Sequence, residues 1–436
     1  MTAAGNSGAE DQTRSLWRAT AVPPPDAPPV TAGGRADAIV VGAGYTGLGA
    51  ALRLAERGRA PLVLEAGDPG FGASGRTGGQ VIPGLKYDPA DLVRLFGDRR
   101  GEAMARFAGS AADATFDLIR RHGIDCAAAQ CGWIQAAASA HACDLLRGRA
   151  RQWADLAGTA VTLLDAAEVL RRTGAHGYRG GWVDPRGGMV QPLSYARGLA
   201  RAAQSAGARV HGASAVTAIA RDGDAWRVSV NGVELSSETV ILATNAYTDD
   251  LWPGLKQSVV PATSVQIATE PLSPDLRNAV LPDGMPVSDS QRLLNYFRLD
   301  AAGRFVIGGR GAFSRARPQA ERHFARLRRV ALRRYPALRG VEWRYRWAGS
   351  VALTQDKLPH LHRLAPGLFA ALGLNGRGVA MSTQLGRLVA DLACGADEDE
   401  IPMPVSGLRP IPLHALRRPG LEAIAIWYRL LDRMGR

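Results

Sequence analysis

The sequence predicts an α/β protein in which a helix-covered parallel sheet is combined with a second, α+β domain built on an antiparallel sheet. Residues 38–65 have the pattern of a strand, a glycine turn, a helix and a second strand, which together form a βαβ unit. Residues 215–244 contain short apolar runs separated by Asp-Gly and Asn-Gly, which indicate hairpins. Residues 259–347 alternate apolar and polar side chains, as half-buried antiparallel strands do.

The first βαβ unit carries the signature of a Rossmann-like dinucleotide site. Residues 38–41 are an apolar strand, and Gly42, Gly44 and Gly47 follow as G-x-G-x-x-G. These glycines allow a tight turn, a close approach of a pyrophosphate and close packing of the helix on the sheet. The helix N-terminus then offers free N–H groups to the diphosphate. Glu65 follows the second strand at the spacing of a ribose hydroxyl acceptor, which favours FAD or NAD over NADP.

A second glycine-rich run, residues 70–80, favours FAD over NAD. Glycine has no side chain to bury and loses the most entropy on ordering, so such a run is not part of a core. It suits a loop whose backbone wraps a ligand. In flavoproteins a loop of this kind lies along the pyrophosphate and reaches the isoalloxazine ring.

Several segments carry the motifs of one enzyme family. They are residues 73–80 (Ala-Ser-Gly-Arg-Thr-Gly-Gly-Gln), 191–201, 242–247, 294–299, 358–360, 373–379 and 426–430. With these motifs the chain resembles the D-amino-acid oxidase superfamily of FAD enzymes, and more narrowly its γ-glutamylputrescine oxidase branch. The resemblance runs from about Leu16 to the C-terminus, and it implies a GR2-type FAD-binding domain.

The glycine motif and the resemblance together imply a noncovalent FAD. Val216 is expected against the adenine, and the helix that begins at Val379 is expected to point at the flavin pyrimidine. Many superfamily members have histidine where this chain has Arg377. The flavin-linking cysteine of sarcosine oxidases would fall near Ser350, so no covalent link is expected. The residues expected to hold FAD are Gly42, Ala43, Gly44, Tyr45, Thr46, Gly47, Glu65, Ala66, Ala73, Ser74, Arg76, Thr77, Gly78, Gly79, Gln80, Val216, Ala243, Thr244, Asn245, Gly349, Gly373, Asn375, Gly376, Arg377, Gly378 and Val379.

The resemblance implies hydride transfer from an amine-bearing carbon to flavin N5, with O2 as acceptor and H2O2 as product. The protein then has to keep the amine neutral, which aromatic walls and desolvation favour. Tyr296 and Trp347 are the candidate aromatic groups, and Arg298 and Arg310 are the candidate clamps for a substrate carboxylate. Core aromatics and structural arginines are the alternative interpretation. γ-Glutamylputrescine carries both an amine and a carboxylate, as such a site requires.

The acceptor and the substrate are left open by the sequence. The oxygen-activating lysine of sarcosine oxidases would fall near Val306, so Arg310, Arg377 or Lys357 would have to supply that positive charge, or the enzyme is a dehydrogenase. Other substrates are a sarcosine-like secondary amine, a cyclic imino acid or an intermediate in a biosynthetic tailoring pathway. A different class is a flavoprotein subunit of a dehydrogenase complex.

The composition of the chain argues against several other classes of protein. The 436 residues are 46% hydrophobic without an apolar run long enough to span a membrane, and no signal peptide is visible, which predicts a cytoplasmic enzyme. The four cysteines lack C-x-x-C spacing, so no metal site is expected. The net charge of +13 comes mainly from arginine, and solvated helix faces are favoured over nucleic-acid binding. A monomer or homodimer is expected.

The predicted domains are discontinuous. Helices with alanine-rich faces are expected over residues 88–176, and an amphipathic helix over residues 420–436. That last helix is expected to pack on the body, with a peripheral membrane or partner contact as the alternative. The predicted division is an N-terminal arm (1–35, partly disordered), an FAD-binding domain (36–87, 177–255 and 348–400), a substrate or cap domain (88–176 and 256–347) and a C-terminal segment (401–436).

Overall fold

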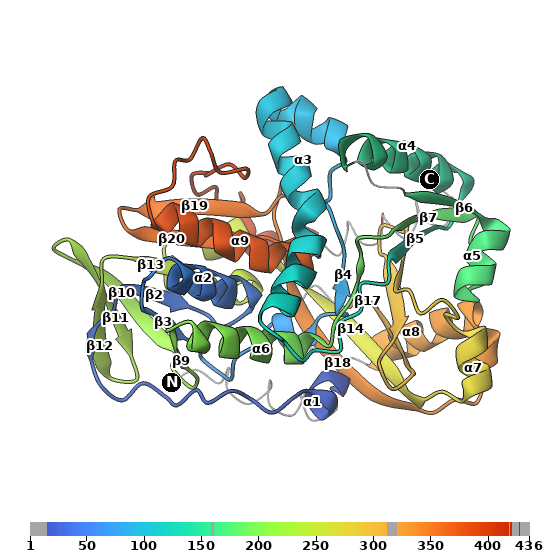
Figure 1. Cartoon of the computed structure of the whole chain (residues 1–436), viewed down its shortest axis with the longest axis horizontal. Coiled ribbons are helices and arrows are strands. Elements are labelled where there is room, and N and C mark those ends of the chain that lie inside the picture. The colour runs from blue at the N-terminus through green and yellow to red at the C-terminus, as the bar shows by residue number, and fades with distance from the viewer. Residues whose placement is uncertain (1–14, 158–160, 312–320, 418, 421–426, 428–436) are drawn as a thin grey trace.

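Two large sheets lie at opposite ends of the molecule, with the long helix α3 standing between them (Figure 1). The computed structural model describes residues 15–157, 161–311, 321–417, 419, 420 and 427. The helices are α1 (Leu16–Thr20), α2 (Tyr45–Glu56), α3 (Pro89–Arg121), α4 (Ala140–Ala157), α5 (Ala166–Thr173), α6 (Pro192–Ser205), α7 (Pro274–Ala279), α8 (Glu321–Arg334) and α9 (Gly378–Ala393).

The six-stranded sheet has the order β19-β20-β13-β2-β3-β9, and all of its strands except β19 run parallel. Its strands are β2 (Ala38–Val41), β3 (Pro61–Leu64), β9 (Arg209–His211), β13 (Val240–Leu242), β19 (His360–Ala365) and β20 (Leu368–Leu372). Every residue of β2 and β3 is buried, because the sheet is covered on both faces. Val40 packs toward helices α2, α3, α6 and α9, whereas its neighbours Ile39 and Val41 pack toward the antiparallel β-strands on the other face. The βαβ unit and its glycine turn are therefore confirmed.

The antiparallel meander covers one face of this sheet. It consists of β10 (Val216–Asp222), β11 (Ala225–Val230) and β12 (Val233–Ser237), and β1 (Gly34–Arg35) pairs with its edge. The two predicted hairpins are confirmed. The last apolar run of the segment 215–244 does not join these hairpins, because β13 pairs in parallel with β2 and β20 instead. Its three residues are fully buried, which suits the centre of a parallel sheet.

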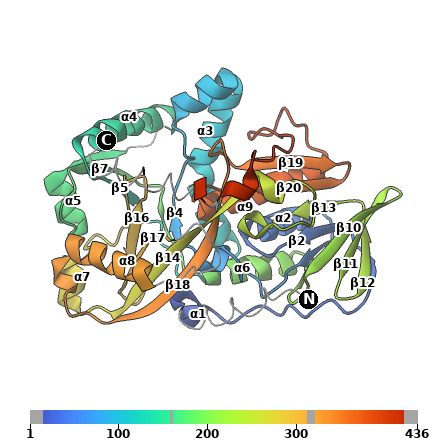
Figure 2. The ribbon, with the colours of Figure 1, turned by 180° about the vertical axis from the view of Figure 1, so that it is seen from behind.

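The eight-stranded sheet has the order β18-β14-β17-β16-β15-β5-β7-β6 and is antiparallel except between β15 and β5. Its long strands β14 and β18 run diagonally across the middle of the molecule (Figure 2). Helix α8 packs Phe324, Leu327 and Ala331 against it and leaves most of its arginines outward. Its strands are β5 (Trp133–Ala137), β6 (Thr162–Asp165), β7 (Gly180–Asp184), β14 (Val260–Pro271), β15 (Val287–Asp289), β16 (Asn295–Leu299), β17 (Arg304–Arg310) and β18 (Trp343–Leu353).

Residues 88–176 are less helical than the sequence suggests. Helices α3, α4 and α5 are present, but β5 lies between α3 and α4, β6 lies between α4 and α5, and both strands belong to the eight-stranded sheet. The buried alanines of α3 pack with α9 and the nucleotide-side helices. The division into domains stays a prediction, and one strand crosses it, because β7 joins the eight-stranded sheet from the segment 177–255.

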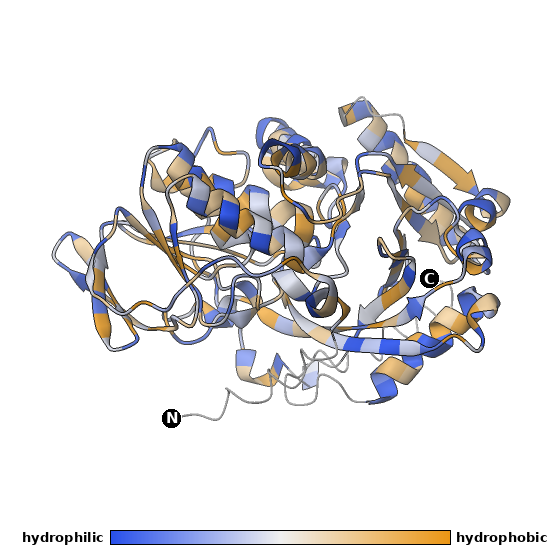
Figure 3. Cartoon of the chain, turned by 60° about the horizontal axis from the view of Figure 1, so that its bottom comes forward, coloured by the Kyte–Doolittle hydropathy of each residue, from blue (hydrophilic) through white to orange (hydrophobic). Residues whose placement is uncertain are grey.

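The N-terminal arm lies along the body from residue 15 onward. Trp17 of α1 is fully buried, and Val22 and Val30 donate backbone hydrogen bonds to the hydroxyls of Ser194 and Ser214. A short antiparallel pair, β4 (Gln80–Val81) and β8 (Gly188–Met189), lies near the centre. Apolar and polar residues alternate along the outer helices (Figure 3).

Most of the helix predicted for residues 420–436 lies outside the described residues, as do residues 1–14. Among the helices that are described, none combines the length and apolar character needed to cross a bilayer. No group of three or more histidine, cysteine or acidic side chains is arranged for a metal ion in the described part of the chain.

Helices α2 and α9 touch at a glycine, and this contact gives a stability test. A Cβ on Gly386 would lie 2.1 Å from the carbonyl oxygen of Thr46, whereas a Cβ on Gly148 of α4 would meet nothing within 4 Å. We expect Gly386→Ala to lower the free energy of unfolding by about 1–3 kcal/mol through overpacking. Gly148→Ala should raise it by about 0.5–1 kcal/mol, because alanine is the better helix former. Denaturant unfolding curves of the two variants measure these changes. Equal changes in the free energy of unfolding would contradict the close contact of α2 with α9.

Candidate active site

A cavity of about 460 Å³ lies between the two large sheets. On one side it is lined by the segments that follow β2, β3, β13 and β20, which is the carboxyl edge of the parallel sheet. Ligands of doubly wound α/β folds bind at this edge. On the other side it is lined by β14, β16, β17 and β18 of the antiparallel sheet. The fold therefore places both predicted halves of the site around one space.

The N-terminus of α2 points at this cavity. Gly47 allows the first turn of α2 to lie close to the end of β2, since a Cβ there would lie 1.8 Å from the carbonyl oxygen of Gly42. Gly44 is the N-cap and has no side chain to satisfy the first-turn N–H groups. Of these, the N–H of Tyr45 donates to Ser74 Oγ at 3.0 Å. The helix end thus offers N–H groups and its positive dipole to an anion in the cavity.

Glu65 holds the glycine turn while it lines the cavity. Its Oε2 accepts from the N–H of Ala43 at 2.7 Å, and its Oε1 accepts from the N–H of Gly67 at 3.0 Å. Burial raises the pKa of this carboxyl group, and the backbone hydrogen bonds oppose that rise. Both oxygens keep a lone pair for a further donor, which fits the predicted ribose contact. Val216, expected near the adenine, lines the same cavity.

The loop of residues 73–80 forms a third wall, and other side chains hold it from behind. Trp17 Nε1 donates to the carbonyl of Thr77 at 2.7 Å, and Trp347 Nε1 donates to the carbonyl of Arg76 at 3.2 Å. Arg298 Nη1 donates to the carbonyl of Gly79 at 3.0 Å. Each of these bonds fixes one peptide of the loop, so the backbone that faces the cavity is rigidly placed.

Trp347 and Arg298 therefore sit behind the site and not in it. Trp347 is 1% exposed and packs edge-on against Trp17 at 5.5 Å between ring centroids. The Arg298 guanidinium lies 5.0 Å over the Trp17 ring, and burial lowers its pKa to about 10. Neither residue lines the cavity. Their placement gives no support to the predicted substrate contacts and assigns both residues to positioning the loop.

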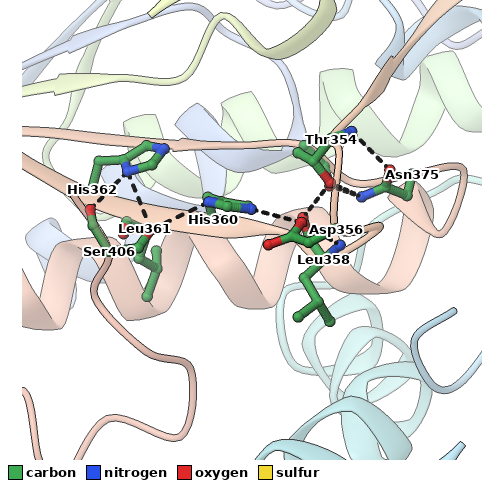
Figure 4. A network of polar contacts seen from close by, with 9 residues as sticks. Thr354, Asp356, Leu358, His360, Leu361, His362, Asn375 and Ser406 are labelled. Atoms are coloured by element: carbon green, nitrogen blue, oxygen red, sulfur yellow. Dashed lines mark hydrogen bonds and ion pairs between the residues drawn. The ribbon is translucent and has the colours of Figure 1, made fainter. Parts of the chain in front are cut away.

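A second glycine turn, between β20 and α9, closes the cavity near the N-terminus of α9. Asn245 Oδ1 accepts from the N–H of Gly373 at 3.0 Å, which ties the end of β13 to this turn. Asn375 is held by Thr354, whose N–H donates to Asn375 Oδ1 at 3.0 Å (Figure 4). In the same network His360 lies between Asp356 and Ser406, with Nε2 3.0 Å from Asp356 Oδ1 (Figure 4).

Tyr296 faces the cavity from β16, as predicted. Its ring fits between two glycines, since a Cβ on Gly78 or on Gly308 would approach it to 2.5 Å or 2.2 Å. Its hydroxyl lies 2.9 Å from Ser264 Oγ. Burial raises the pKa of the Tyr296 phenol to about 12, so at neutral pH it is a neutral hydrogen-bonding group and an apolar wall. Arg310, at the end of β17, also lines the cavity.

The sequence reasoning missed part of the substrate side. Trp133 and Gln135 line the cavity from β5, a strand that falls in the segment predicted as helices. Their i, i+2 spacing, which places them on one face of a strand, was the available signal. Lys86 also lines the cavity. Arg377 lies with its guanidinium 5.4 Å over the Trp133 ring, and burial lowers its pKa to about 10, which leaves it charged at neutral pH.

Most of the residues predicted for FAD line the cavity together. The residues of that predicted set that line it are Gly42, Gly44, Tyr45, Thr46, Glu65, Ala66, Ala73, Ser74, Arg76, Thr77, Gly78, Gly79, Gln80, Val216, Ala243, Thr244, Asn245, Gly349, Asn375, Gly376, Arg377, Gly378 and Val379. Ala43, Gly47 and Gly373 lie just behind it, in the contacts described above. Two helix N-termini, a buried acid and two glycine cradles fit an extended diphosphate-containing cofactor.

This combination of a glycine-rich βαβ entry and an antiparallel sheet opposite it defines a flavin-dinucleotide-binding oxidoreductase. Residues 37–392 match the family model described as FAD dependent oxidoreductase, DAO. The chain belongs to this family, and FAD is its cofactor.

The similar proteins include several that are named as oxidoreductases or oxidases. The gamma-glutamylputrescine oxidoreductase of Escherichia coli (strain K12) is 33% identical over 401 residues, which cover 92% of this chain and 93% of that protein. The probable oxidoreductase OrdL of Haemophilus influenzae is 32% identical over 380 residues, covering 85% and 86%. The crystal structure of glycine oxidase from Geobacillus kaustophilus is similar, with a TM-score of 0.68 and 26% identity, covering 83% of this chain and 95% of that one. The resemblance seen in the sequence is thus confirmed.

The turn before α2 gives a direct test of cofactor retention. A Cβ on Gly44 would lie 2.9 Å from Ser74 Oγ and on the cavity side of the turn, so a valine would fill space that the diphosphate needs. We expect Gly44→Val to be purified without flavin, with the 450 nm absorbance lost. Gly148→Ala is the matched control and should stay yellow. A yellow Gly44→Val protein would contradict the assignment of this turn.

Proposed function

We propose that the protein is an FAD-dependent amine oxidase acting on γ-glutamylputrescine or a related polyamine derivative, with O2 as acceptor. One observation supports this above all: the substrate side of the cavity combines aromatic walls, Tyr296 and Trp133, with cationic side chains, Arg310 and Arg377. An aromatic, poorly hydrated wall favours a neutral amine. A guanidinium suits a carboxylate at the other end of the same molecule. The relative from Escherichia coli carries this substrate in its name.

The bound flavin would supply the hydride acceptor, and the residues of this chain would position the substrate. The loop of residues 73–80 and the two glycine turns would hold FAD without a covalent link. Ser350 lines the cavity where a linking cysteine would be expected, and none of the four cysteines lines it. Because Tyr296 keeps its proton at neutral pH, it would shape the pocket and donate a hydrogen bond, and it would not act as a base.

The positive charge that favours electron transfer to O2 would come from Arg377 or Arg310, which both line the cavity. Lys357, the other candidate, is exposed and does not line it. A cytoplasmic location suits the four cysteines, which are unpaired in the structure. Among other amines, a small amino acid is the second candidate, because a glycine oxidase from Geobacillus kaustophilus is 28% identical over 368 residues.

Flavin reduction tests this proposal. We expect γ-glutamylputrescine to bleach the 450 nm absorbance of the anaerobic protein, and we expect air to restore it with formation of H2O2. Glycine and putrescine are tested at the same concentration. Glycine tests the hypothesis of an amino-acid substrate, and putrescine tests that of a simple amine. Bleaching that air does not reverse would make the protein a dehydrogenase. Bleaching by glycine but not by γ-glutamylputrescine would overturn the proposed substrate.

A further inference from the structure

Lys86 is a cavity-lining cation that the proposed function does not yet use. It lies between β4 and α3 and lines the cavity close to Trp133 and Arg377. Its side chain is exposed, and it lines the cavity. Lys86 is therefore accessible to a molecule bound in the cavity.

The charged groups that lower the pKa of Lys86 are cations from four separate segments of the chain. They are Arg377 before α9, Arg310 on β17, Arg149 on α4 and Lys357 before β19. Arg149 is paired, since its Nε donates to Asp88 Oδ1 at 2.6 Å, and Arg377 donates to the carbonyl of Pro83. Among the residues that the structure describes, the ammonium group of Lys86 makes no hydrogen bond and no ion pair. Burial and these like charges lower the pKa of Lys86 to about 7.

Within the described residues, none of the acids that line the cavity forms an ion pair with Lys86. Glu65 holds the glycine turn at the opposite end, as described above. Asp289 accepts hydrogen bonds from the backbone N–H and the side-chain amide of Asn295, both at 2.9 Å. Asp249 lies in the segment after β13, on the nucleotide side of the cavity. An unpaired ammonium held among other cations is destabilised by them, and a bound anion would offset this repulsion.

We propose that Lys86 binds the carboxylate of the substrate, so that the cavity selects amines that also carry an anionic group. The proposal rests on the proposed amine oxidation and names the substrate class of that site. The ammonium would donate a charge-assisted hydrogen bond to a carboxylate oxygen from the wall that also holds Arg377. The neighbouring cations disfavour a protonated Lys86 in the empty cavity. The bound anion would offset this repulsion.

Proton uptake follows from this arrangement. A bound carboxylate stabilises the protonated lysine and raises its pKa, so the complex holds more protons than the empty cavity does. Anion affinity should consequently fall as the pH rises above 7, by up to about tenfold for each pH unit. An arginine at this position would stay charged, so binding would no longer depend on pH in this range.

The test is a titration of the FAD-bound protein with butyrate, followed by the change in flavin absorbance, with 1-butanol as the uncharged match. Butyrate does not titrate near neutral pH and is not an amine, so binding is measured without turnover. Lys86→Met should weaken butyrate roughly 10- to 100-fold and leave butanol unchanged. Lys86→Arg should keep the preference for butyrate and remove its fall above pH 7. Lys357→Met is the matched control, since it removes a nearby charge that does not line the cavity.

Two results would overturn the proposal. One is butyrate binding that is unchanged in Lys86→Met while the variant retains FAD and the melting temperature of the parent. The other is an equal loss of butyrate affinity in Lys357→Met. Such a loss would mean that the overall positive potential of the pocket, and not a contact with Lys86, determines the affinity. Flavin reduction by amines is measured separately, so a protein that binds butyrate through Lys86 but oxidises no amine would refute the proposed function alone.

Discussion

The close contact of α2 with the glycine turn and with α9 is the constraint on which the site depends. Two missing side chains permit it, since a Cβ would lie 1.8 Å from a backbone oxygen at Gly47 and 2.1 Å from one at Gly386. In this arrangement the end of β2 and the N-termini of both helices line the same cavity. The positive ends of two helices then face the same cavity, which is where a diphosphate and an electron-rich ring are best stabilised.

A second layer of contacts makes the loop of residues 73–80 part of this frame. Its peptides are held by Trp17, Trp347 and Arg298, which come from the N-terminal arm and the antiparallel sheet. The N-terminal arm therefore contributes to the site, because it supplies one of the hydrogen bonds that position the loop. Through the loop, the antiparallel sheet and the nucleotide-side sheet share one boundary, and substrate and cofactor would meet there.

The nucleotide half was predictable because its signals are local. Spacing alone identifies the turn from Gly42 to Gly47 and the acid at Glu65. The substrate half depends on long-range pairing: β5 pairs with β15 across about 150 residues and with β7 across about 50, and in this arrangement Trp133 lines the cavity. The strand period also predicts that Trp347 and Tyr345 share a face, but not that Trp347 is buried against Trp17 from the arm. For Arg298 the residue type fits a carboxylate clamp and a buried loop support equally well.

This frame is expected to hold one noncovalent FAD and to turn a cationic, aromatic pocket toward it. The identity and amount of flavin released when the purified protein is precipitated with acid test this expectation. We expect one FAD for each chain, all of it in the supernatant. Flavin that stays with the precipitated protein would contradict the noncovalent cradle, and protein without any bound flavin, even after reconstitution with FAD, would contradict the site itself.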